Sequence, residues 1–249
     1  MRFFFFLAVL ALPYFVLPAP SPYSVDQLRV QAERGDPAAQ TELCVHYIPA
    51  VPPNYAEAVK WCRKAAAQGR VEAQNNLGVL YVKGRGVPQD YAEAAKWYRK
   101  AADQRHAEAQ HNLGVLYFNG HGVPQDYAEA AKWYRKAADQ GLADDQHNLG
   151  NAYLKGRGVP QDYAEAAKWY RKAADQGHPY AQNNLGVLYA EGRGVPQDDA
   201  EAYFWLNLAV ISGNEKSAKA RAAMEARLSP EGLSAAQKRA REWKPTRRP

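Results

Sequence analysis

The stretch PQDYAEAAKWYRKAADQ, which begins at Pro88, occurs again without change at Pro124 and at Pro160. The tryptophan inside it belongs to a series that recurs every 36 residues: Trp61, Trp97, Trp133, Trp169 and Trp205. Copies of one segment at a fixed period of this length are typical of repeat proteins, in which each copy forms one supersecondary unit. The sequence therefore predicts an array of five units, of which the first and the last have diverged.

Each unit of this array is predicted to consist of two helices joined by a glycine-containing loop. In the second unit, Ala73, Leu77 and Tyr81 recur four residues apart, so a helix over this segment carries them on one face. Gly84 and Gly86 follow and permit left-handed backbone, which ends that helix. The first helix of a unit is therefore expected to stop at a loop with two glycines.

The second helix of each unit is predicted to start at the aspartate of the repeated stretch. Asp90, with Glu93 three residues later, has the pattern of an N-cap and capping box. The buried stripe of this helix is expected to comprise Ala94, Trp97, Tyr98 and Ala101. Glycine ends most of these second helices, but Arg105 takes that place in one unit. We expect Arg105 to loosen or reshape its corner, because a side chain disfavours a left-handed cap.

The full pattern AxxxLGxxYxxGxGVxxDxxxAxxWYxKAAxQG resembles the Sel-like repeat (suppressor/enhancer-of-lin type), a relative of the tetratricopeptide repeat, over residues 38–213. No single unit can bury its own stripe, so the units are expected to stack into an all-α, right-handed α-solenoid with a concave and a convex side. The resemblance implies that the first helices line the concave face. Residues 23–37 are expected to form an N-terminal capping helix, and residues 214–249 two closing helices and a basic tail.

The N-terminal segment, residues 1–20, predicts export. One basic residue, Arg2, precedes an apolar run from Phe3, and the small, proline-rich stretch PAPSP follows. The run is too short to span a bilayer comfortably. We interpret it as a secretory signal, which places the mature chain in the periplasm or outside the cell without a transmembrane domain. Retention through an N-terminal anchor is the competing interpretation.

The expected concave face mixes amides, imidazoles and apolar side chains, which suits an extended peptide because asparagine offers both a donor and an acceptor. The predicted partner-binding residues are Asn75, Asn76, His111, Asn112, Phe118, His147, Asn148, Asn151, Tyr180, Asn183 and Asn184. For the asparagine that recurs in every full unit, at 76, 112, 148 and 184, the alternative is a bond to the adjacent loop that fixes the repeat geometry. The predicted function is an exported scaffold or adaptor that binds an unidentified protein or peptide.

A second function stays open, because some exported relatives of this repeat class have been proposed to bind or hydrolyse penicillin-like compounds. The chain would then be an envelope protein that binds cell-wall fragments or acts on them. The familiar serine chemistry on such compounds uses a Ser-x-x-Lys nucleophile, and no lysine follows any serine of this sequence at that spacing. GxSxG and P-loop patterns are also missing from the sequence. We therefore predict no enzymatic activity and no cofactor.

The cysteines and histidines were the remaining candidates for covalent or metal chemistry. Cys44 and Cys62 both fall in the first unit, at positions where its two helices face each other. In an exported chain this predicts a disulfide, and two buried thiols are the alternative.

His111 and His147 occupy equivalent places one repeat apart, a separation of roughly 8–10 Å that is too long for ligands of one zinc ion. No metal site is predicted.

The net charge of +6 lies entirely in the C-terminal segment. Residues 1–213 contain 22 basic and 22 acidic residues, whereas residues 214–249 contain 10 basic and 4 acidic residues. The basic tail is expected to be mainly a solvated helix face that makes weak contact with an anionic surface. No nucleic-acid partner is expected, because export separates the chain from nucleic acid.

Overall fold

The computed structural model describes residues 22–49 and 53–246, and every regular element in these ranges is helical. The predicted all-α fold is therefore confirmed for this part of the chain. The segment 1–20, for which the sequence predicts a secretory signal, lies outside the described residues. None of the described helices combines the length and the apolar character that a membrane crossing requires.

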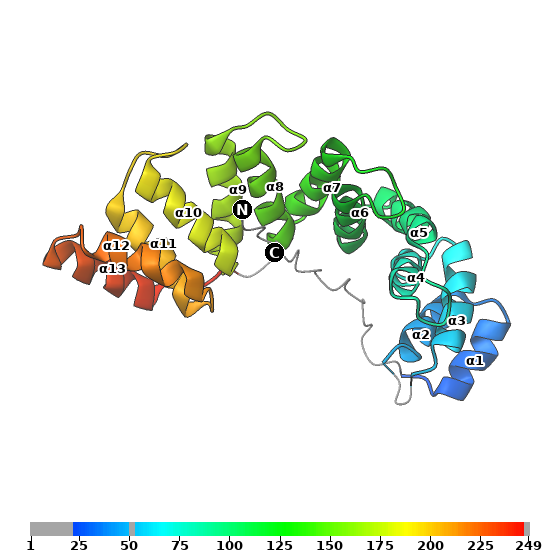
Figure 1. The fold of residues 1–249 in the computed structure, drawn as a ribbon. Helices are drawn as coiled ribbons and strands as arrows, with labels where there is room; N and C mark the ends of the chain where they lie inside the picture. The colour runs from blue at the N-terminus through cyan, green and yellow to red at the C-terminus, as the bar shows by residue number, and fades with distance from the viewer. Residues whose placement is uncertain (1–21, 50–52, 247–249) are drawn as a thin grey trace. The chain divides into compact units, whose positions relative to one another are not determined.

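Successive helices form five pairs, as the 36-residue period predicts (Figure 1). The first helices of the pairs are α2 (Pro37–His46), α4 (Val71–Lys83), α6 (Ala107–Asn119), α8 (Ala143–Lys155) and α10 (Pro179–Glu191). The second helices are α3 (Tyr55–Ala67), α5 (Tyr91–Asp103), α7 (Tyr127–Asp139), α9 (Tyr163–Asp175) and α11 (Asp199–Ile211). The flanking elements are α1 (Val25–Glu33), the 3₁₀ turn η1 (Glu215–Ser217), α12 (Ala218–Glu225) and α13 (Pro230–Glu242). Contacts between consecutive helices give the pattern of a repeat solenoid.

The helices group into two compact units, each with a core of its own. The N-terminal unit ends at Asn112 and the C-terminal unit begins at Leu113, so the boundary falls inside α6. Trp61 lies fully buried in the core of the first unit, and Trp205 in that of the second. Each core draws on several helix pairs, because one pair cannot enclose its apolar stripe alone.

Within a pair, the two helices approach closely at a glycine of the first helix. A Cβ on Gly150 would lie 2.6 Å from the ring of Tyr170, far inside van der Waals contact. In the first pair these two positions hold Cys44 and Cys62, which are joined by a disulfide with their Cα atoms 4.7 Å apart. The first pair therefore has a covalent link at the place where the next three pairs have a glycine packed on a tyrosine and the last has Gly186 packed on Leu206.

The second helices begin at an aspartate, as predicted. The Oδ1 atom of Asp90 accepts hydrogen bonds from the backbone amides of Ala92 and Glu93, both at 2.9 Å. The predicted capping box is wrong, because the Asp90 amide donates to the carbonyl of Tyr81 and the Glu93 carboxylate pairs with Lys96. The same aspartate cap recurs at Asp126, Asp162 and Asp198. The aspartate therefore fixes where four of the second helices start, and Asn54 takes the same place in the first pair.

Arg105 keeps the corner geometry that glycine has in the other pairs. Its φ is +66°, and it is the one described residue other than glycine in the left-handed region. Its amide donates to the carbonyl of Ala102 at 3.0 Å, as the amide of Gly141 donates to Ala138. The expectation of a loosened or reshaped corner is therefore wrong. Packing of the helix pair holds the backbone in place despite the strain of the side chain.

Replacing Arg105 by glycine should raise the free energy of unfolding by about 1 kcal/mol, because glycine carries no steric cost in this conformation. For a chain of this size that corresponds to a rise in melting temperature of roughly 2–4 °C. Circular dichroism at 222 nm measures it, with Gly141→Arg as the reverse variant. A lower melting temperature for Arg105→Gly would show that contacts of the arginine side chain outweigh its backbone strain.

The closing helix α13 packs on α11. Ala236 and Ala240 are buried, and the guanidinium of Arg239 lies 3.9 Å from the centre of the Phe204 ring while it pairs with Glu201. One of the basic residues expected to meet an anionic surface is therefore part of the packing. Exposed basic side chains of this segment include Lys238, Arg241 and Lys244, and Arg239 itself stays half exposed. Arg247 and Arg248 lie outside the described residues.

Candidate functional site

Four of the predicted binding residues are buried in the N-terminal unit. Asn75 and Asn76 have no exposed surface, and His111 and Asn112 are 3% and 6% exposed. The first helices of consecutive pairs contact each other, as α2 and α4 do, and this packing covers the side chains between them. The prediction that this stripe of the first helices is exposed is therefore wrong for these four residues.

The recurring asparagine bonds a side chain of the preceding first helix. Nδ2 of Asn112 donates to Oδ1 of Asn75 at 3.1 Å. In the C-terminal unit, Nδ2 of Asn184 lies 3.3 Å from Nε2 of His147, which holds the place equivalent to Asn75. At these two positions the asparagine joins one pair to the next, and its partner is a side chain and not the backbone of the adjacent loop.

Asn76 has no such partner. Both polar atoms of its amide are buried, and neither forms a hydrogen bond with any of the described residues. In the first pair, Thr41 holds the place equivalent to Asn75 and would be the partner of Asn76. The Thr41 hydroxyl donates instead to the carbonyl of Pro37 at 2.8 Å. A buried amide without partners costs stability, so the start of the asparagine series is its weakest point.

His147 is the centre of an amide network in the C-terminal unit. The Nδ2 atoms of Asn151 and Asn184 lie 3.2 and 3.3 Å from its Nε2, so this nitrogen accepts from both amides and carries no proton. Burial, together with the charge of the adjacent His178, lowers the pKa of His147 to about 3. The imidazole is therefore neutral at physiological pH and acts as a hydrogen-bond acceptor.

The network continues on both sides of this histidine. The hydroxyl of Tyr170 donates to Oδ1 of Asn151 at 2.7 Å. Nδ2 of Asn183 donates to Oδ1 of Asn184 at 3.1 Å, and the hydroxyl of Ser217 donates to Oδ1 of Asn183 at 2.8 Å. These three asparagines are thus engaged within the chain. Their first effect is to fix the side chains that border the surface of α8 and α10.

An aromatic and imidazole cluster lies next to the network. The His178 ring stacks on His147 with centroids 4.6 Å apart, and its Nε2 is 3.2 Å from the carboxylate of Asp144. Tyr180 lies beside both imidazoles and is 55% exposed. Among the predicted binding residues, Tyr180 is the one that presents most of its surface to solvent.

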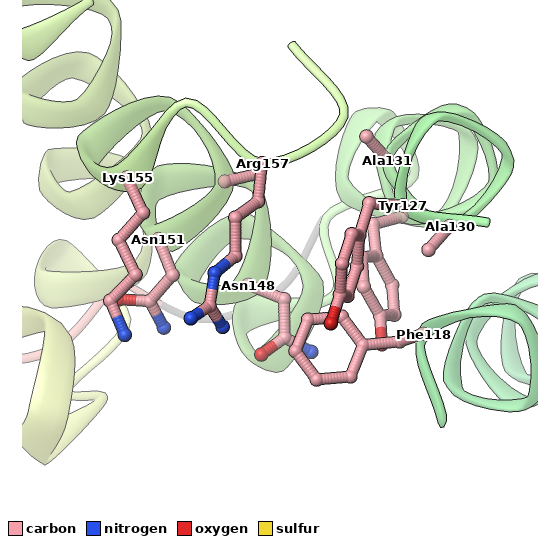
Figure 2. Close-up of a pocket in the computed structure, with 10 residues that line it drawn as sticks. Phe118, Tyr127, Ala130, Ala131, Asn148, Asn151, Lys155 and Arg157 are labelled. Atoms are coloured by element: carbon pink, nitrogen blue, oxygen red, sulfur yellow. The ribbon is translucent and has the colours of Figure 1, made fainter. Parts of the chain in front are cut away.

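A pocket of about 120 Å³ lies between α7 and α8. The rings of Phe118 and Tyr127 lie on one side, and Asn148 and Asn151 of α8 lie on the other (Figure 2). Tyr134 also lines the pocket. No described residue forms a hydrogen bond with the Asn148 side chain, so its donor and its acceptor are both free in the pocket. Three predicted binding residues, Phe118, Asn148 and Asn151, therefore meet at one place.

The pocket exists because α8 departs from the repeat at two adjacent positions. Three other first helices carry valine and leucine there, and the leucines Leu80, Leu116 and Leu188 are no more than 3% exposed. In α8 the same positions hold Asn151 and Ala152. Alanine leaves unfilled the space that a leucine side chain would occupy, and asparagine adds an amide beside it.

Lys155 and Arg157 give the pocket positive charge. No carboxylate of the described residues pairs with either, and the Arg157 guanidinium lies 5.8 Å from the centre of the Tyr127 ring. In the next pair the equivalent residues are Glu191 and Arg193, which neutralise each other in an ion pair of 2.7 Å. The loop after α8 therefore keeps two free cations, whereas the loop after α10 keeps none.

The pocket is lined by aromatic, amide and basic side chains. Its lining holds no carboxylate, histidine, cysteine or serine. Burial raises the pKa of Tyr134 far above its usual value, so its hydroxyl stays protonated. Within the described ranges, no three His, Cys, Asp or Glu side chains are arranged to hold a metal ion. The lining offers the free amide of Asn148, aromatic surface and positive charge.

Several residues of the pocket were not predicted from the sequence: Tyr127, Tyr134, Ala152, Lys155 and Arg157. Aligning the repeats with one another exposes Ala152, because every other full unit has leucine at its position. Tyr127 and Tyr134 give no such signal, since the same tyrosines occur in the unchanged copies of the repeated stretch. These tyrosines line a pocket only because α8 has Ala152 in place of leucine.

A family model described as Sel1 repeat matches five consecutive segments of the chain, at residues 37–69, 71–106, 107–142, 143–178 and 179–214. These segments follow the five helix pairs. No curated protein matches the sequence closely.

Two crystal structures are similar over most of the chain. A protective antigen present in uropathogenic Escherichia coli strains, which displays an SLR fold, is 39% identical over 88% of this chain with a TM-score of 0.79. A Sel1 repeat protein from Oxalobacter formigenes is 37% identical over 79% of this chain with a TM-score of 0.70. The present chain spans 49% of the first of these proteins and 58% of the second.

Proposed function

Because the chain belongs to the Sel1 repeat family, whose members generally serve as protein–protein interaction scaffolds, we propose that it is an exported scaffold that binds a peptide segment of a partner protein in the α8 pocket. The observation that carries this proposal is the free amide of Asn148 in a pocket walled by aromatic rings. An asparagine amide matches the N–H and C=O groups of one peptide unit, and the rings offer apolar surface to the adjoining side chain. Sel1-repeat proteins are typically non-catalytic, and we propose the same for this chain.

The amide network supports this role because it holds the pocket wall in place. Asn151 is fixed between the hydroxyl of Tyr170 and the imidazole of His147, with distances of 2.7 and 3.2 Å. A wall that is ordered before the ligand arrives reduces the entropy lost on binding. Among the predicted binding residues, Asn148 and Phe118 face a ligand, whereas the residues of the His147 network position the pocket.

Export is the second part of the proposal. The basic and apolar start of the sequence supports it, and so does the disulfide between Cys44 and Cys62, because such bonds persist in oxidising compartments and are rare in the cytosol. Periplasmic or secreted location is the expected outcome. Fractionation of cells that produce the full chain measures it, and a wholly cytosolic, reduced protein would contradict it.

Filling the pocket should abolish peptide recognition without harming the fold. The variant Ala152→Leu restores the leucine that three other pairs carry, and we expect it to stabilise the C-terminal unit by about 1 kcal/mol. A displayed library of random peptides, selected on the wild-type protein, should yield sequences whose affinity falls at least tenfold on Ala152→Leu. Fluorescence anisotropy with the selected peptides measures this fall.

The control variant is Ala223→Leu, which adds the same side chain to an exposed position of α12. It should bind the selected peptides like the wild-type protein. Equal affinity of the selected peptides for Ala152→Leu would exclude the pocket as the binding site. Soluble cell-wall fragments in the same assay test the alternative function: fragments that bind where no peptide does would favour an envelope role in cell-wall recognition.

A further inference from the structure

We propose that the α8 pocket recognises the C-terminal residue of a partner chain, with its aliphatic side chain in the space beside Ala152 and its terminal carboxylate on Lys155 and Arg157. This inference rests on the proposed function, which assigns peptide binding to the same pocket. It adds the class of peptide: one that ends in a free carboxylate and a side chain of about the size of leucine.

The positive charge of the pocket points to an anionic ligand. Lys155 and Arg157 both line the pocket, and no acidic side chain of the described residues pairs with them. The next pair shows how the same loop is neutralised from within, because Glu191 pairs with Arg193 at 2.7 Å. After α8, Lys155 takes the place of that glutamate, so the charge of Arg157 is not neutralised by an ion pair. A carboxylate is the anion that a peptide supplies to lysine and arginine.

The size of the pocket restricts the rest of the ligand. Its volume is about 120 Å³, slightly smaller than the cavity of about 150 Å³ that holds a benzene molecule in an engineered protein, so one aliphatic side chain fits. The apolar space and the two cations belong to this one pocket. A single residue meets both only if it carries an apolar side chain and a carboxylate on the same Cα, and in a peptide that residue is the last one.

The residues take separate roles in this arrangement. Arg157 lies over the ring of Tyr127, which holds the guanidinium at the rim. Figure 2 shows Lys155, Arg157 and Asn148 on the side of the pocket that lies across from the rings of Phe118 and Tyr127. Lys155 and Arg157 bind the terminal carboxylate, and Asn148 pairs with the last peptide unit. Ala152 and the aromatic rings receive the side chain.

The test uses two matched fluorescein-labelled probes, Gly-Ser-Gly-Ser-Leu with a free C-terminus and the same peptide with an amidated C-terminus. The full chain is labelled with ¹⁵N, and the side-chain NH₂ signals of Asn148 are assigned by their loss in Asn148→Ser. We expect the free-acid peptide to shift these signals and the amidated peptide to bind at least tenfold more weakly, because it lacks the charge-assisted bonds.

The informative variant is Lys155→Glu, which copies the residue that pairs with arginine in the next pair. The new glutamate should pair with Arg157 and leave the circular dichroism spectrum unchanged. The affinity for the free-acid peptide should fall at least tenfold, and the affinity for the amidated peptide should change little. The matched control is Lys83→Glu, which makes the same charge change at the equivalent place of α4. It should bind both probes like the wild-type protein.

The possible results separate this inference from the proposed function. Equal binding of both probes to the wild-type protein, lost on Ala152→Leu, would overturn the carboxylate assignment and leave peptide binding in place. Failure of both probes to move the Asn148 signals would overturn the inference, and the library selection then decides the proposed function on its own. An equal shift with acetate at the same concentration, or equal weakening by Lys83→Glu, would show general anion attraction and would overturn it as well.

Discussion

Lowering the pH from 7 to 5 should destabilise the C-terminal unit by about 2 kcal/mol through His147 alone. The folded protein keeps this imidazole neutral, with a pKa of about 3, whereas the unfolded chain takes up a proton near pH 6.5. Between these two values the unfolded state binds more protons than the folded state. Stability is therefore full above pH 6.5 and falls as the pH falls toward 3.

The structural cause of this sensitivity is visible in the contacts of the ring. Its Nε2 accepts from Asn151 and Asn184, and a proton on that nitrogen would face two amide donors. Burial is the main cause of the lowered pKa; His178 and Lys155 lower it further, while Asp144 acts in the opposite direction. Acid should therefore disrupt the amide network at its centre and, with it, the wall of the pocket.

The variant His147→Asn isolates this effect, because asparagine holds the equivalent place in α4 and accepts there from Asn112. It should keep the bond to Asn184 and lose the pH dependence that belongs to the histidine. Urea unfolding at pH 7 and pH 5 measures both proteins, and the wild-type protein should lose about 2 kcal/mol more than the variant. Equal losses would show that His147 is protonated in the folded state at pH 5, and its ¹⁵N chemical shifts would then report a charged ring.

The repeat made the fold predictable from the sequence. The second unit has Ala73, Leu77 and Tyr81 on one helix face and Asp90 at the start of the next helix. This pattern occurs with little change in four pairs, so each copy supports the helices predicted for the others. Arg105 shows the limit of local reasoning. Its side chain disfavours the conformation that it adopts, and the packing of the surrounding pair prevails over that preference.

The candidate site was predicted only in part, because exposure depends on the neighbouring helices. Asn76 and Asn148 are equivalent in the sequence, yet Asn76 is buried without a partner whereas Asn148 faces an open pocket. What separates them is the residue four positions later, Leu80 in one case and Ala152 in the other. Whether a polar side chain of a repeat can bind a ligand therefore depends on the neighbouring side chain that covers it.

Removing the disulfide should cost the N-terminal unit about 3 kcal/mol, the largest loss expected from any covalent change in this chain. Cys44 and Cys62 are 18 residues apart, and a cross-link over a loop of this length restricts the unfolded chain by roughly that free energy. The bond also replaces the packing of glycine on tyrosine that joins the helices of the next three pairs. The variant Cys44→Ala/Cys62→Ala loses both contributions.

Two comparisons test this account of the first pair. Reductant should lower the stability of the wild-type protein to near that of Cys44→Ala/Cys62→Ala and leave the variant unchanged, as measured by urea unfolding at pH 7. The variant Cys44→Gly/Cys62→Tyr restores the residues of the later pairs and should recover about 1–2 kcal/mol through burial of the aromatic ring, in the presence or absence of reductant. A wild-type protein whose unfolding is insensitive to reductant would show that the first pair is held by apolar packing and that its cysteines contribute as two buried thiols.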